Sequence, residues 1–77
     1  MSTYRVGTVA HLCQRLAIVP IEAEEVPSIG TRVVDKELRR VGRIVDIFGP
    51  VSAPYAAISP TDRETGARLI GERVYAR

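Results

Sequence analysis

The sequence predicts an all-β fold, a small six-stranded antiparallel β-barrel, on three observations. Short segments rich in Val, Ile and Tyr recur along the 77 residues and are separated by Gly, Pro and polar turn residues. The best run of helix formers, residues 36–40, is too short for a stable isolated helix. Closure into a barrel would remove the exposed edges of so small a sheet. The predicted strands are residues 3–13, 16–21, 31–35, 42–48, 55–59 and 72–76.

The first two predicted strands form a hairpin. Residues 3–13 alternate well enough for a half-buried strand, and Gln14-Arg15 supplies a tight polar turn into residues 16–21. Pro20 cannot donate to a strand ladder, so it marks a sheet edge or the end of the strand.

Three segments are predicted to be connections. Residues 22–30 contain three acids together with Pro and Gly, which is typical of a loop. Residues 36–40 fit a hairpin loop, and the polar residues 61–67 include Gly66 and are also predicted as a loop.

The central strand, residues 42–48, carries large apolar groups on both faces. Strict alternation puts Ile44 and Phe48 on one face and Val45 and Ile47 on the other. Either the turns of the protein cover the second face, or another molecule does.

A stiff corner follows this strand. Gly49-Pro50 ends it, because Gly permits positive φ and Pro lacks the amide that a ladder needs. Pro54 holds the preceding residue in an extended conformation, and Tyr55 opens the next strand. A corner with so little freedom to lose on binding favours a docking surface, the alternative being a barrel corner that packs inward.

Composition indicates one domain, residues 1–77, in a reducing cytoplasmic setting. The hydrophobic fraction of 45% argues against disorder, and one Cys excludes an internal disulfide. No apolar run is long enough to span a bilayer, so no membrane role is expected.

No residue pattern predicts catalysis, a metal or another cofactor. His11 and Cys13 would share one strand face, but zinc needs at least three protein ligands and no others are apparent. Cys13 has no oxyanion loop nearby, and no glycine-rich phosphate motif occurs. We therefore expect a protein that is not an enzyme.

The net charge of +2 is weak for a domain that binds nucleic acid by itself. Basic residues outnumber acidic ones in residues 32–43. The basic residues there are Arg32, Lys36, Arg39, Arg40 and Arg43, and the acidic residues are Asp35 and Glu37. Such a cluster fits a solvated hairpin, a phosphate contact or protein docking.

The run from Val41 to Ile58, with Gly-Pro-Val-x-x-Pro-Tyr at its corner, resembles the core of the GAR-family subunit of H/ACA ribonucleoproteins. The likeness extends to Val6-Gly-Thr-Val9, to Ile29-Gly-Thr-Arg-Val-Val-Asp35 and to Ile70-Gly-Glu-Arg-Val-Tyr75. The Gly-Arg-rich tails of eukaryotic members are absent, so the chain is similar to the short archaeal form.

This resemblance implies a non-catalytic accessory subunit that docks on the dyskerin-type H/ACA pseudouridine synthase. It implies that guide and substrate RNA are reached only indirectly, through a complex that modifies rRNA, and that the subunit assists substrate loading and release. Carried over by position, the partner-binding residues are Arg43, Ile44, Phe48, Gly49, Pro50, Val51, Pro54 and Tyr55. An uncovered corner would also allow the isolated chain to self-associate.

Two other functions stay open. A small β-barrel that binds RNA directly in ribosome biogenesis would use Arg39, Arg40 and Arg43, and its affinity would fall steeply with salt. An esterase or thiol enzyme would depend on Cys13.

Overall fold

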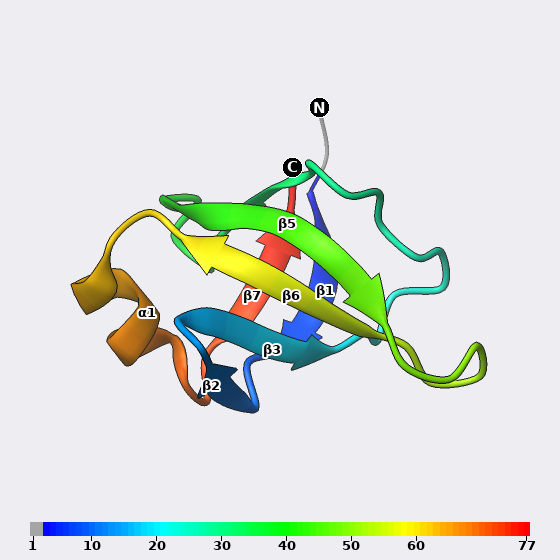
Figure 1. The fold of residues 1–77 in the computed structure, drawn as a ribbon. Coiled ribbons are helices and arrows are strands. Elements are labelled where there is room, and N and C mark those ends of the chain that lie inside the picture. Colours follow the sequence, from blue (N-terminus) through cyan, green and yellow to red (C-terminus); the bar gives the residue numbers. More distant parts are fainter. Residues whose placement is uncertain (1–2) are drawn as a thin grey trace.

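The strands form one antiparallel sheet that curls on itself into a half-barrel (Figure 1). The structure is a computed structural model and describes residues 3–77. Its elements are β1 (Tyr4–Thr8), β2 (His11–Cys13), β3 (Leu16–Pro20), β4 (Arg32–Val34), β5 (Arg40–Phe48), β6 (Tyr55–Pro60), α1 (Arg63–Leu69) and β7 (Arg73–Ala76). The strand order is β1-β7-β4-β5-β6-β3-β2, and every pair is antiparallel. The all-β class predicted from the sequence is therefore confirmed.

The first segment of the chain contributes a strand to each end of the sheet. β1 pairs with β7, whereas β2 pairs with β3 at the other end of the strand order. The change of partner falls at two neighbouring amides: Val9 N donates to Glu72 O at 3.0 Å, and Ala10 N donates to Ile18 O at 2.9 Å. The predicted single strand 3–13 is thus divided in two, which gives seven strands where the sequence predicted six.

A close approach at Gly7 brings β1 against the end of β3. A Cβ at this position would collide with the Pro20 carbonyl oxygen and lie 2.9 Å from Val19 Cγ1. The amide of Glu22 donates to the Val6 carbonyl at 2.7 Å, beside this contact. Only a residue without a side chain lets β1 lie against the end of β3 in this way.

The core fills the inside of the curl. It consists of β-branched and small apolar side chains from six of the strands, together with Val9 between β1 and β2 and Leu69 of α1. Among them, Val6, Val19, Val33, Ile44, Ile58 and Val74 have no exposed surface. Side chains of alternate residues point into this space, as expected for strands with one buried face.

The segment predicted as a loop at residues 61–67 contains a helix, α1, instead. Asp62 caps it, because its carboxylate accepts a hydrogen bond from Thr65 N at 2.7 Å. Leu69 reaches the core and is only 4% exposed. Gly66, taken as a sign of a loop, is buried, and a Cβ there would lie 3.0 Å from Pro60 Cγ. The glycine therefore allows α1 to pack closely on the end of β6.

The hairpin turns lie where the sequence placed them. Gln14 and Arg15 have φ values of 50° and 70° and connect β2 to β3, the left-handed backbone that a two-residue hairpin turn requires. The turn between β4 and β5 is organised by Asp35, whose Oδ1 accepts hydrogen bonds from the amides of Glu37 and Arg39, both at 2.9 Å.

Candidate functional site: the apolar corner between β5 and β6

A bulge in β5 decides which side chains face the core. Ile44 pairs with Ile58 and Asp46 pairs with Ala57, so Val45 is an extra residue with no partner on β6. Ile44 is fully buried, and Ile47 packs against the core. The strict alternation predicted from the sequence is wrong here, because the bulge turns Ile44 and Ile47 to the same side.

Beyond the bulge, an aromatic pair stands at the start of the corner. Phe48 and Tyr55 lie directly opposite each other on β5 and β6, and their rings stack with centroids 5.6 Å apart and planes at 17°. Tyr55 is half-buried, whereas Phe48 remains 42% exposed. The stacked pair therefore lies where the corner leaves the sheet.

The turn beyond this pair is held at both ends. Gly49 adopts φ +93°, and a Cβ there would lie 2.9 Å from Tyr55 Cδ1, so the aromatic ring occupies the space of a side chain. Ala53 N donates to the Pro50 carbonyl at 3.0 Å, and Ile21 N donates to the Pro54 carbonyl at 3.0 Å. The corner is therefore tied both to itself and to the segment that follows β3.

The tip of the corner is apolar and uncovered. Val51 is 99% exposed, the largest exposure among the large hydrophobic side chains of residues 3–77. We define the apolar corner as Phe48, Gly49, Pro50, Val51, Pro54 and Tyr55. In Figure 1 this corner is the hairpin that extends beyond β5 and β6, at the end of the molecule opposite α1.

Two of the predicted contact residues lie elsewhere. Ile44 belongs to the core and has no exposed surface, so its assignment to the partner surface is wrong. Arg43 is exposed, but it lies before the bulge and is paired with Ser59 of β6 and Arg32 of β4, away from the turn. Phe48, Pro50 and Val51 are exposed, as a contact surface needs.

Two apolar side chains outside the predicted contact residues are also exposed. Val45 is 40% exposed because the bulge turns it outward, and Ile29 is 63% exposed in the loop before β4. Gly30 N donates to the Ile44 carbonyl at 2.7 Å, which holds that loop against β5. The sequence had placed Val45 on a second apolar face of this strand, whereas it gave no prediction for Ile29.

The residues considered for a metal or a thiol enzyme lie on β2. His11 and Cys13 are both exposed on β2, and in this part of the chain no three His, Cys, Asp or Glu side chains converge as a metal site would require. None of the helices that the structure describes is long and apolar enough to cross a membrane.

The two carboxyl groups with altered pKa values both support turns. Burial acts to raise the pKa of Asp35, but hydrogen bonds from the amides of Arg39 and Glu37, with the Arg39 guanidinium, outweigh it and leave the pKa below its usual value. The hydrogen bond from the Thr65 amide lowers the pKa of Asp62. Each carboxylate therefore stabilises local backbone rather than a reacting group.

Both the sequence and the fold of this chain match known proteins. Residues 3–77 match the model of the Gar1 family, described as the Gar1/Naf1 RNA binding region. The chain belongs to this family. Its fold is also similar to a solved structure of the Gar1 domain of Naf1, with a TM-score of 0.75 and 20% sequence identity over 97% of this chain and 81% of that one.

Two archaeal relatives are similar in sequence. An uncharacterised protein of Methanothermobacter thermautotrophicus is 28% identical over 72 residues, which cover 90% of this chain and 77% of the relative. An uncharacterised protein of Methanocaldococcus jannaschii is 44% identical over 36 residues, which cover 47% of this chain and 43% of the relative. Family and fold together identify this chain as an RNA-related β-domain.

Proposed function

We propose that this chain is a non-catalytic accessory subunit of an H/ACA guide RNA–protein complex. It docks through the apolar corner on the catalytic domain of the dyskerin-type pseudouridine synthase and assists the loading and release of substrate RNA in rRNA pseudouridylation. Membership of the Gar1/Naf1 family supports the RNA-related role. The docking role is supported by the exposed corner itself.

One observation carries the docking proposal: a fully exposed Val51 at the tip of a turn that is braced at both ends. Apolar side chains in protein interfaces contribute most when they enter a pocket on the partner. A turn that is already ordered loses little conformational entropy on binding, so more of the contact free energy appears as affinity. Val51 with the exposed part of Phe48 is suited to such a pocket.

An accessory subunit of this kind would act by choosing among conformations of the enzyme. A bound partner shifts a conformational equilibrium only by the difference in its affinity for the two states. The corner must therefore bind more tightly to the synthase conformation that admits and releases RNA.

Co-purification with the synthase tests this proposal. Phe48→Ala combined with Tyr55→Ala removes the stacked pair, and we expect the variant to fold and to lose the synthase in a pull-down. Tyr4→Ala is a matched control, because Tyr4 is an aromatic residue 45% exposed on β1, outside the corner. Equal recovery of the synthase with the folded double variant and with the control would refute the docking assignment.

A second candidate function is direct RNA binding in ribosome biogenesis, which the description of the family favours. The sequence assigned this role to Arg39, Arg40 and Arg43. Arg39, however, is paired with Asp35 at 3.2 Å and with Glu37 at 2.8 Å. A titration of the isolated chain with RNA at low salt tests this candidate, and absence of binding there would exclude it.

A further inference from the structure

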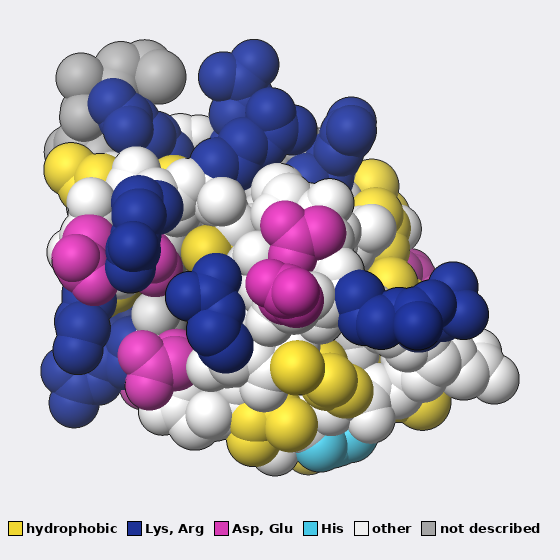
Figure 2. All heavy atoms as spheres, turned by 90° about the vertical axis from the view of Figure 1, so that its left-hand side faces the viewer, with side chains coloured by type: hydrophobic (Ala, Val, Ile, Leu, Met, Phe, Trp, Pro, Cys, Tyr) yellow, Lys and Arg dark blue, Asp and Glu magenta, His cyan; other side chains and the backbone are white. Residues whose placement is uncertain are grey.

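Four exposed arginines near the α1 end of the molecule have no acidic partner within residues 3–77. The ion pairs in this part of the chain join Arg5 to Glu22, and Arg39 to Asp35 and Glu37. The exposed arginines outside these pairs include Arg15, Arg32, Arg43 and Arg63. Figure 2 shows this end of the molecule, where Lys and Arg side chains lie around much of the rim and outnumber the Asp and Glu side chains between them.

Two of these arginines stand side by side on the sheet. Arg32 of β4 is paired directly with Arg43 of β5, and Arg43 is paired with Ser59 of β6. All three side chains are exposed, whereas the neighbouring Ile44 faces the core. Like charges directly opposite each other on neighbouring strands destabilise a sheet. This cost would become a gain if an anion lay across both guanidinium groups.

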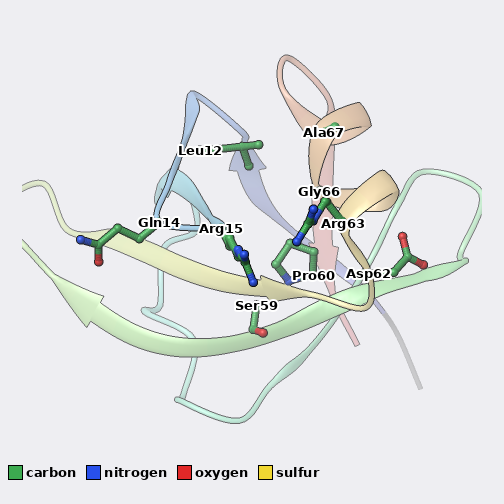
Figure 3. Close-up of a pocket in the computed structure, with 9 residues that line it drawn as sticks. All are labelled: Leu12, Gln14, Arg15, Ser59, Pro60, Asp62, Arg63, Gly66 and Ala67. Carbon is green, nitrogen blue, oxygen red and sulfur yellow. The ribbon is translucent and has the colours of Figure 1, made fainter.

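The other two arginines line a cavity that begins at Ser59. The cavity has a volume of about 550 Å³ and lies between the β2–β3 turn, the end of β6 and α1. Figure 3 shows Arg15 extending from the turn and Arg63 extending from α1 toward the space between them. Leu12 and Pro60 provide apolar walls.

One acidic residue also lines this cavity, and its carboxylate is already engaged. Asp62 Oδ1 accepts the hydrogen bond of the Thr65 amide at 2.7 Å, as the cap of α1. In Figure 3 the Asp62 side chain points away from the two guanidinium groups. The cavity therefore presents two cations that no carboxylate of residues 3–77 neutralises.

We propose that the cavity and the neighbouring pair Arg32 and Arg43 form a binding site for the phosphate backbone of a single RNA strand. The strand lies in the cavity between Arg15 and Arg63 and continues past Ser59 over Arg43 and Arg32. Guanidinium groups bind phosphate through two parallel N–H···O bonds, which a point charge cannot do. Contacts of this kind position a strand without reading its bases, so the site is sequence-tolerant.

This inference rests on the RNA-related role proposed above but not on docking. The cavity lies beside α1, and the apolar corner lies at the opposite end of the molecule (Figure 1). A subunit held to the synthase through the corner would therefore keep this site open. The two surfaces together would let one small domain hold an enzyme at one end and an RNA strand at the other.

Fluorescence anisotropy with a labelled single-stranded RNA of mixed sequence tests the site over a series of salt concentrations. Each phosphate contact to a single strand contributes about −0.7 to the slope of log K against log salt, so four contacts predict about −2.8. Arg15→Gln with Arg63→Gln, and separately Arg32→Gln with Arg43→Gln, should each reduce the slope by about 1.4 in magnitude. The matched control is Arg5→Gln with Arg39→Gln, which removes the same charge from arginines that already have partners and should keep the wild-type slope.

Three RNA-binding results would overturn the site. These are no RNA binding by the folded chain at low salt, equal loss in the control and test pairs, and displacement of the RNA by a poly-glutamate peptide of matched charge. Loss of the synthase from a pull-down with either test pair would also overturn it, since the arginines would then be protein contacts. Failure of docking through the apolar corner is detected separately, because the corner variants should bind RNA normally.

Discussion

Val51→Asp separates the docking role of the apolar corner from its role in the fold. Val51 is 99% exposed and is absent from the core and from the residues packed against it. A substitution at such a position changes the free energy of unfolding by no more than about 0.5 kcal/mol. Any large effect on the complex must therefore come from the interface.

The expected loss of affinity follows from burial of this side chain by the partner. Transfer of a Val side chain from water to an apolar pocket contributes about 1.5–3 kcal/mol. Since about 1.4 kcal/mol corresponds to a tenfold change in Kd, losing that contact weakens binding by about 10- to 150-fold. Burying an unpaired carboxylate in the same pocket adds a further penalty, so this range is a lower bound.

Isothermal titration calorimetry of the synthase catalytic domain with wild-type and variant chains measures this change. Thermal unfolding of the isolated chain checks that the variant is folded. Leu38→Asp is the matched control, because Leu38 is 53% exposed in the turn between β4 and β5. An unchanged Kd for Val51→Asp, or an equal change for Leu38→Asp, would show that the corner is not the docking surface.

Three further predictions concern the fold that carries these surfaces. Gly42→Ala should reduce the free energy of unfolding by about 1–3 kcal/mol in a denaturant titration, because its Cβ would collide with the Ser59 carbonyl; wild-type stability would contradict this. Asp62→Ala should lower the denaturant midpoint of unfolding through loss of the α1 cap, whereas Asp62→Asn keeps an acceptor oxygen and should lower it less, and equal stability of all three chains would contradict the capping role. The pKa of Asp35 is lowered in the fold, so its stabilisation is present above the usual value of 3.8 and is lost as pH falls through the lower folded pKa. The stability difference between wild type and Asp35→Ala should therefore shrink below that pH, and a constant difference would show that the charge contributes nothing.

The positions of the strands and of the corner could be predicted from the sequence, because residues adjacent in the chain determine where each strand ends. Pro50 lacks an amide and Gly49 allows positive φ, so the end of β5 follows from neighbouring residues alone. The Gln14-Arg15 turn likewise lies between two short apolar segments. The helix at α1 was not predicted, because Gly66 normally indicates a loop and its reason here is close packing on Pro60.

The composition of the candidate surfaces could be predicted only in part. Phe48 and Val51 follow from the apolar corner in the sequence, but Ile44 was assigned to the same surface and lies in the core. The bulge at Val45 caused this error, because one extra residue on β5 reverses the inward and outward alternation that follows it. Whether a strand accepts such a residue depends on its partner strand, which sequence periodicity does not specify.

By itself, the sequence determined the class of fold, most of its turns, and the stiff apolar corner between β5 and β6. Only the tertiary structure decided that residues 3–13 divide into two strands at opposite ends of the strand order, and that Arg32, Arg43 and Ser59 form one row. The physical reason is the range of the interactions. Turn chemistry acts between adjacent residues, whereas closure, bulges and rows of side chains depend on the register between strands that are far apart in the chain.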